Sequence, residues 1–257
     1  MREAASGDAA RPASELSRVD VAVLAGGLGT RLATRLGELP KIMAPAGGRP
    51  FLDHLLAWLA GQGVHRVVLC LGHRAAPVLD HLRHSPPAGI EVVCSVEPEP
   101  LGTAGALAHA RKLLTSDPVL AMNGDTLAEV DLAAFLAAYR AARAGMALVS
   151  AAVDEPGRYG RIEIDGDGRV LRFREKSQAE APPYWISAGI YLLDRATLDE
   201  IAALGRGSLE HDFFERRPAG SLFAFRIAGR FLDIGTPETL ALVRDGVGAY
   251  AASPDAR

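Results

Sequence analysis

Apolar residues follow different patterns in the two halves of this chain. In the first half, short continuous apolar runs alternate with longer stretches whose apolar residues recur at helical spacing. The runs predict buried strands at Val19–Gly27, His65–Gly72, Ile90–Val96 and Pro118–Asp125. The longer stretches predict helices at Pro50–Gly61, Pro77–Arg83, Thr103–Leu114 and Asp131–Ala144, the last ended by Gly145. Strands that are apolar on both faces are typical of a parallel sheet with helices on both sides.

Strands dominate the second half of the chain. We expect them at Met146–Val153, Gly160–Asp165, Gly168–Lys176, Trp185–Leu193, Ser221–Ile227 and Gly229–Gly235. Gly166–Gly168 predicts a hairpin turn. This half therefore predicts a mixed extension of the same sheet. The expected fold is one α/β domain over residues 18–257, with a Rossmann-like, mixed but mostly parallel sheet flanked by helices, after a disordered tail at residues 1–17.

Charge and hydropathy exclude several classes of function. The formal net charge is -3, which argues against a general nucleic-acid binder, since such proteins are usually basic. No run reaches the roughly 18 consecutive apolar residues of a membrane span, and the first residues lack the apolar core of a secretory signal. We therefore expect a cytoplasmic protein with no nucleic-acid or membrane partner. A homodimer is compatible with the sequence.

A glycine-rich loop follows the first predicted strand, in the segment Leu24–Leu32. Glycine lets the backbone approach a ligand closely, and consecutive N–H groups before a helix attract phosphate oxygens. A Walker A loop would need Gly-Lys-Ser/Thr, but the chain has Gly29-Thr30-Arg31. A dinucleotide fingerprint would need a small residue at Leu32 and an acid after the second strand. Arg31 and Lys41 are cations suited to polyphosphate, the alternative being solvated surface positions.

The segments LAGGLGTRL and LPKIMAPAGGRPFLDHLL resemble the opening of the sugar-phosphate nucleotidyltransferase family. The resemblance implies the nucleotide-diphospho-sugar transferase fold and a Mg²⁺-dependent transfer from a nucleoside triphosphate to a sugar 1-phosphate. It implies that Arg31 and Lys41 hold the phosphates during catalysis. Ile42 departs from the family, which usually has proline after this lysine. The loop residues expected to hold the nucleotide are Leu24, Ala25, Gly26, Gly27, Gly29 and Thr30.

Two aspartates are candidates for a metal site. Asp125 ends the fourth predicted strand, at the edge where open α/β sheets bind ligands, and Asp233 lies within FLDIGTPE. Mg²⁺ typically takes one or two carboxylates together with substrate phosphates. Each aspartate alone could also be a turn or capping residue. The resemblance implies that Asp125 and Asp233 are the family's metal-binding pair and that Asp125 takes part in catalysis.

Four residues of the second half are expected at the sugar phosphate. The resemblance implies that Glu175 binds sugar hydroxyls and that Lys176 binds the phosphate, although Arg-Glu-Lys could also be an exposed ion pair. It implies that Gly160 lets the sugar approach the backbone. Ser187 stands where the family usually has asparagine on a sugar-contacting strand, so the hydrogen bond of that asparagine is in question here.

The segment EPEPLGTAGAL, which begins at Glu97, is expected at the base of the nucleotide. Gly102 permits close approach, and Thr103 can cap the helix that follows. An ionised carboxylate only accepts hydrogen bonds, and guanine offers two adjacent N–H donors, whereas uracil and thymine offer one donor between two acceptors. Glu97 therefore favours GTP, the alternative being a solvent-facing loop glutamate.

Within the family, the motifs are most similar to guanylyltransferases that act on D-glycero-α-D-manno-heptose 1-phosphate and make GDP-heptose for bacterial surface polysaccharides. Mannose 1-phosphate enzymes of short single-domain type are the alternative, and other hexoses and nucleotides stay open. A non-catalytic nucleotide-sugar-binding regulator on the same fold is a different class. For an enzyme, the sugar phosphate is already an anion, so the reaction needs positioning and positive charge rather than a general base.

Overall fold

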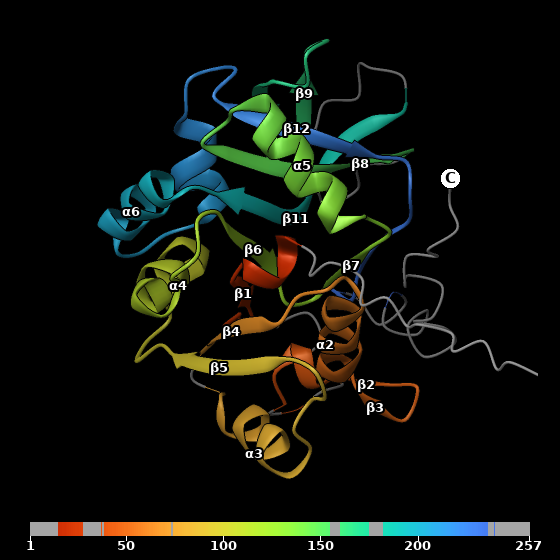
Figure 1. Ribbon diagram of the computed structural model, residues 1–257, viewed down its shortest axis with the longest axis vertical. Helices are drawn as coiled ribbons and strands as arrows, with labels where there is room; N and C mark the ends of the chain where they lie inside the picture. Colours follow the sequence, from red (N-terminus) through yellow and green to blue (C-terminus); the bar gives the residue numbers. More distant parts are fainter. Residues whose placement is uncertain are drawn as a thin grey trace, which may run out of the picture.

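The computed structural model describes residues 15–27, 37, 39–72, 74–154, 160–174, 182–235 and 239. These residues form a nine-stranded mixed sheet with helices on both faces (Figure 1). The strands of the first half run parallel in the order β6-β1-β4-β5, which confirms the expected parallel sheet. Their bounds are Val21–Leu24 for β1, Arg66–Leu71 for β4, Glu91–Val96 for β5 and Val119–Asn123 for β6.

Antiparallel strands of the second half extend this sheet, as predicted. β11 pairs antiparallel with β6, β8 and β9, so it joins the two halves. β9 and β10 form the expected hairpin, and β12 pairs parallel with β8. Their bounds are Met146–Val153 for β8, Arg161–Ile164 for β9, Val170–Arg174 for β10, Tyr184–Leu193 for β11 and Leu222–Ile227 for β12.

Helices bury both faces of the sheet. α2 and α5 lie over one face, and α4 and α6 lie over the other (Figure 1). Val21 and Val23 of β1 enter the first core, whereas Ala22 and Leu24 enter the second, which is why the apolar run of this strand is continuous. The helices are α2 (Phe51–Gly61), α3 (Ala76–His84), α4 (Gly102–Ala110), α5 (Leu132–Ala142) and α6 (Arg195–Leu204).

The ends of two helices differ from the prediction. Asp131 caps α5, since its side chain accepts hydrogen bonds from the backbone N–H groups of Ala133 and Ala134. α5 ends at Arg143, which takes the left-handed conformation with φ 47°, and not at Gly145. α4 begins at Gly102 without a side-chain cap, so the predicted capping role of Thr103 is wrong.

Two short sheets lie outside the main one. β7 (Thr126–Ala128) pairs antiparallel with β13 (Phe231–Asp233), and β2 (Pro45–Ala46) pairs with β3 (Arg49–Pro50). The predicted strand at 229–235 therefore exists in shorter form, but it does not join the main sheet. The described segment between β11 and β12 also contains α6 and the π-helical turn Leu209–Phe213, which the sequence pattern did not predict.

The fold begins earlier than predicted. Residues Glu15–Arg18 form a 3₁₀ helix, and Leu16 within it is fully buried in the first core. The boundary of the predicted tail at residue 17 is therefore wrong, while residues 1–14 lie outside the described residues. None of the helices in the described part of the chain has the length and hydrophobicity that crossing a membrane requires.

Candidate active site

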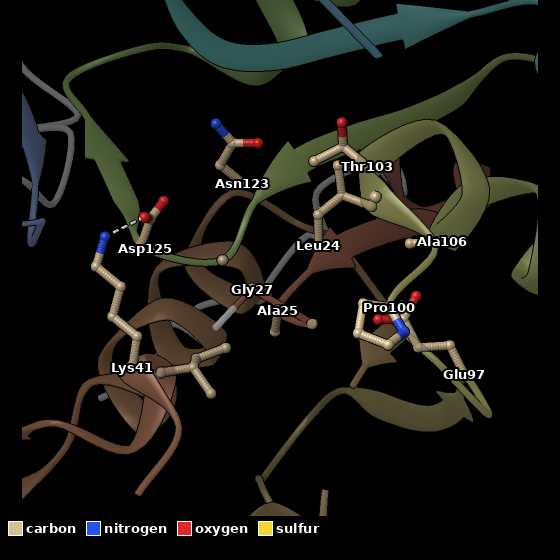
Figure 2. Close-up of a pocket in the computed structure, with 14 residues that line it drawn as sticks. Leu24, Ala25, Gly27, Lys41, Glu97, Pro100, Thr103, Ala106, Asn123 and Asp125 are labelled. Carbon is tan, nitrogen blue, oxygen red and sulfur yellow. Dashed lines mark hydrogen bonds and ion pairs between the residues drawn. The ribbon is translucent and has the colours of Figure 1, made fainter. Parts of the chain in front are cut away.

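A pocket of about 460 Å³ opens at the carboxyl ends of the parallel strands, where open α/β sheets bind their ligands (Figure 2). Its walls come from the loop after β1, the start of the 3₁₀ helix Lys41–Met43, the loop into α4 and the end of β6. Gly29, Thr30 and Arg31 lie outside the described residues. The predicted residues that line the pocket are Leu24, Ala25, Gly26, Gly27, Lys41, Glu97, Gly102, Thr103 and Asp125.

Close contacts with Glu97 and with the backbone of Gly72 explain why residue 26 is a glycine. A Cβ atom on Gly26 would lie 2.8 Å from Glu97 Oε1 and 3.3 Å from the backbone nitrogen of Gly72. Gly72 is equally constrained, since its Cβ would lie 2.6 Å from the Gly26 carbonyl oxygen. The loop after β1 therefore rests directly on the loop after β4 and on Glu97.

Glu97 is a buried carboxylate and not a solvent-facing loop residue. It follows β5 and is 6% exposed. Its Oε2 accepts a hydrogen bond from the backbone N–H of Leu101 at 3.3 Å. Figure 2 shows Glu97 at one end of the pocket, beside Pro100, and Lys41 with Asp125 at the other end. A carboxylate thus lies at the end of the pocket away from Lys41 and Asp125.

Thr103 connects this pocket to the π-helical turn. Its hydroxyl accepts a hydrogen bond from the backbone N–H of Leu209 at 2.7 Å. Nearby, Gly102 has a φ of +76°, and a Cβ there would lie 2.4 Å from the Gly207 carbonyl oxygen. That oxygen also accepts from the backbone N–H of Ala104 at 2.9 Å. The start of α4 is therefore fixed against the segment that leads into the π-helical turn.

Lys41 joins the two predicted metal-binding aspartates. Its Nζ forms an ion pair with Asp125 Oδ2 and lies 3.4 Å from Asp233 Oδ1. Asp125 lies in the turn between β6 and β7, and Asp233 is the last residue of β13, paired with Thr126. The short β7–β13 sheet thus brings the two carboxylates to one cation, although Lys41 and Asp233 are 192 residues apart in sequence.

These donors fit a magnesium ion. Both carboxylates already share a positive charge, and oxygen ligands are the ones that Mg²⁺ prefers. Among the described residues there is no group of three or more His, Cys, Asp or Glu side chains placed to hold a metal. A site with two protein carboxylates would therefore be completed by water or by phosphate oxygens of a substrate.

A second pocket, of about 250 Å³, adjoins the first through Asn123, which lines both. It contains three predicted residues, Gly160, Ser187 and Asp233, while Glu175 and Lys176 lie outside the described residues. The space beside Gly160 is open, since a Cβ there would come no closer than 3.7 Å to the Arg174 carbonyl oxygen. Asp125 and Asp233 therefore belong to the walls of two adjoining pockets.

The model of the nucleotidyl transferase family matches residues 21–243. The chain belongs to this family. It is 34% identical to the D-glycero-alpha-D-manno-heptose 1-phosphate guanylyltransferase of Aneurinibacillus thermoaerophilus, over 86% of this chain and 94% of that one. It is also 34% identical to the mannose-1-phosphate guanylyltransferase of Mycobacterium tuberculosis, over 86% of this chain, but it spans only 62% of that protein's length.

Solved structures agree with this placement. The crystal structure of HddC from Yersinia pseudotuberculosis superposes with a TM-score of 0.79 and 34% identity, covering 88% of this chain and 98% of HddC. HddC has also been solved complexed with GMP-PN, and that structure gives a TM-score of 0.77. The single α/β domain described above is therefore the nucleotidyl transferase fold.

Several residues at the candidate active site were not singled out from the sequence. Asn123 comes two residues before Asp125, and this position could have indicated that it lines both pockets. Gly189, with φ +68°, leaves room for that side chain, since a Cβ on it would lie 2.4 Å from Asn123 Nδ2. Glu210 and His211 come from the unpredicted π-helical turn, so no pattern pointed to them.

Proposed function

We propose that this protein transfers a guanylyl group from GTP to a sugar 1-phosphate and releases pyrophosphate. The acceptor we favour is D-glycero-α-D-manno-heptose 1-phosphate, and the product would be GDP-heptose. The observation that carries the proposal is the meeting of two pockets at Lys41, Asp125 and Asp233. Such a junction suits a reaction that brings two anions together beside a cation.

The larger pocket would hold GTP. Its phosphates would lie at the end with Lys41, and the guanine would lie near Glu97, whose carboxylate would accept from the adjacent N1–H and N2–H donors. The similarity to guanylyltransferases and to HddC, solved complexed with GMP-PN, supports this choice of base. Arg31, which lies outside the described residues, stays a predicted phosphate ligand.

The smaller pocket would hold the sugar 1-phosphate with its phosphate toward Asn123 and Asp233. The attacking phosphate oxygen is already negative, so no side chain has to remove a proton. Asp125 and Asp233 would hold Mg²⁺, which when bound supplies positive charge to the phosphate oxygens of both substrates. Lys41 would then pair with the triphosphate and stabilise the leaving pyrophosphate. Lys176 stays a predicted ligand of the sugar phosphate.

Relatives acting on heptose and on mannose match equally well by identity. The chain spans 94% of the heptose enzyme and 62% of the mannose enzyme. We keep heptose as the favoured sugar on the resemblance of the motifs, and mannose 1-phosphate is the second candidate. We further propose a cytoplasmic role in the synthesis of capsule or lipopolysaccharide precursors. The predicted homodimer would be tested by the mass of the protein in solution.

The test is pyrophosphate release from four nucleoside triphosphates combined with heptose, mannose and glucose 1-phosphates in the presence of Mg²⁺. We expect GTP with heptose 1-phosphate to give the highest kcat/KM. Asp233→Asn should be nearly inactive, whereas Asp167→Asn, in the exposed β9–β10 turn, should match the wild type. No release with any pair would instead favour the non-catalytic regulator, and a preference for UTP or dTTP would contradict the guanylyl assignment.

A further inference from the structure

Three side chains form a chain of hydrogen bonds along one wall of the smaller pocket. The backbone N–H of Gly189 donates to Ser187 Oγ at 3.2 Å. Ser187 Oγ and Tyr191 OH lie 3.1 Å apart. Tyr191 OH donates to Glu210 Oε1 at 2.6 Å. Ser187 and Glu210 line the pocket, and Tyr191 lies behind them.

The direction of these bonds follows from the number of protons. A tyrosine hydroxyl has one proton, and an ionised carboxylate has none to give. The proton of Tyr191 therefore goes to Glu210, so Ser187 must donate its own proton to Tyr191. Ser187 consequently has no proton left for a ligand in the pocket. Ser187, which stands where the family usually has asparagine, therefore forms hydrogen bonds within the wall of the pocket.

The surroundings of Tyr191 keep its hydroxyl protonated, so that it can donate a hydrogen bond. Its side chain is 1% exposed, and its ring packs against Phe214 with the ring centroids 5.0 Å apart. It lies four residues after Ser187 in β11, so strand alternation puts both hydroxyls on the same side. The register of the pairing with β8 shifts between these two residues. Burial, together with the negative charge of Glu210, raises the pKa of Tyr191 well above its ordinary value, so the hydroxyl stays protonated at any physiological pH.

Only one of the two carboxylate oxygens of Glu210 accepts a hydrogen bond within the described part of the chain. Tyr191 holds Oε1, and Oε2 has no partner among the described residues. Glu210 belongs to the π-helical turn, in which Leu209 and Phe213 are buried while Glu210 and His211 line the pocket. Such turns often occur at functional sites, because the wider winding turns a side chain out of the helical register.

We propose that Glu210 is a specificity-determining residue that accepts hydrogen bonds from sugar hydroxyls, and that Tyr191 is the positioning residue that holds it. The inference rests on the proposed function and names the chemistry of the sugar pocket. A fixed carboxylate requires a donor opposite it, so the pocket should favour a sugar with a hydroxyl at that position over the deoxy sugar. Glu210, from the π-helical turn, would thus bind a sugar hydroxyl in place of the asparagine that the family usually has on β11.

The test compares Glu210→Gln and Tyr191→Phe in pyrophosphate release. We expect Glu210→Gln to raise KM for the sugar 1-phosphate by about tenfold or more, while KM for GTP stays within about twofold. Tyr191→Phe should raise the same KM by a smaller factor, about threefold to tenfold, because Glu210 is loosened but retained. Tyr139→Phe, which removes a hydroxyl from another buried tyrosine on α5, is the matched control and should leave both KM values unchanged.

A series of monodeoxy sugar 1-phosphates identifies the hydroxyl concerned. For the analogue that lacks it, wild type and Glu210→Gln should have equal KM values, whereas they should differ for the other analogues. Equal KM values for the complete sugar would overturn the inference. So would a Tyr191→Phe variant in which KM for GTP rises as much as KM for the sugar, since that outcome marks a purely structural role. An inactive wild type would refute the proposed function itself.

Discussion

At the scale of single residues, one ammonium group balances two carboxylates at the candidate metal site. Lys41 pairs with Asp125 and lies 3.4 Å from Asp233. Carboxylates this close together repel one another unless a positive charge lies between them. A divalent ion that bound both aspartates would have to displace the lysine. We therefore expect Lys41 and Mg²⁺ to compete for this site until the phosphates of a substrate offer the lysine another partner.

Removing this lysine should strengthen metal binding in the absence of nucleotide. Lys41→Met keeps most of the side-chain volume but removes the competing charge, so we expect Mn²⁺ to bind at least several-fold more tightly than to the wild type. A titration of Mn²⁺ followed by electron paramagnetic resonance measures this. Lys112→Gln, which changes an exposed lysine that lines neither pocket, should bind Mn²⁺ like the wild type. Weaker binding by Lys41→Met would contradict the competition.

The choice of base should depend on the charge of Glu97. In Glu97→Gln, an amide replaces the carboxylate and can present its NH₂ group where the guanine N–H donors need an acceptor. We expect the ratio of kcat/KM for GTP to that for UTP to fall by about tenfold or more. Glu99→Gln, which changes an exposed neighbour paired with Arg206, is the control. An unchanged GTP preference in Glu97→Gln would remove Glu97 as the residue that selects guanine.

At the scale of elements, the start of α4 depends on a glycine. Gly102 has a φ of +76°, and a Cβ there would lie 2.4 Å from the Gly207 carbonyl oxygen. Gly102→Ala should therefore lower the free energy of unfolding by at least about 1–2 kcal/mol from backbone strain alone. Gly61→Ala, at the end of α2 with open space around it and no positive φ, should be neutral or stabilising. Urea unfolding measures both, and an equal response would contradict the strain at Gly102.

Three of the strands with continuous apolar runs were predictable because they are buried on both faces, whereas β5, at the end of the sheet, is mostly half-buried. β1, β4 and β6 carry this signal in every residue or nearly every residue. β13 has three residues, too few for a periodicity, and nothing in its composition shows that it pairs with β7. The π-helical turn is held by the contact between Thr103 and Leu209, which are distant in sequence. Its position could not be derived from local pattern.

The site was predictable to a similar extent. Residues in family motifs, such as Lys41, Asp125 and Asp233, converge as the resemblance implied, although their roles stay predictions. The hydrogen bond between Ser187 and Tyr191 could not be predicted, because residues four apart in a regular strand are too distant to bond. The irregularity of β11 between them is not visible in the sequence. Sequence motifs identify the residue types of a site, whereas the direction of each hydrogen bond requires the assembled fold.

At the scale of the whole molecule, Asp20 links the amino ends of neighbouring parallel strands, at the opposite end of the sheet from the candidate active site. It precedes β1, is 5% exposed, and pairs with Arg66 of β4 at 2.8 Å. It also accepts hydrogen bonds from the backbone N–H groups of Thr115 and Ser116, just before β6. The amino ends of three neighbouring parallel strands therefore depend on one carboxylate.

This arrangement predicts a pH dependence of stability. Burial alone would raise the pKa of Asp20, but the hydrogen bonds from Thr115, Arg66 and Ser116 outweigh it, so the pKa lies below its ordinary value. A carboxyl group with a lowered pKa stabilises the fold fully above the unfolded-state pKa, about 4, and this contribution is lost as the pH falls through the folded-state pKa.

Asp20→Asn should therefore lower the free energy of unfolding at pH 7 by on the order of 2 kcal/mol. The difference from the wild type should shrink as the pH falls below about 4, where the wild-type carboxyl also loses its charge. Urea unfolding at a series of pH values measures this difference, with the exposed Asp167→Asn as the reference substitution. A difference that stays constant down to pH 2 would show that ionisation of Asp20 contributes nothing.

The pairing of β13 with β7 also has a consequence for the order in which the protein matures. The parallel half alone contains Lys41, Asp125 and the walls around the larger pocket, but the second carboxylate comes from a strand near the far end of the described fold. A nascent chain that ended before β13 would contain these residues but lack the second carboxylate, so we expect it to be unable to catalyse the transfer. Activity would appear in one late step, when the three residues of β13 pair with the three residues of β7. Incompletely synthesised chains would therefore not react with the substrate.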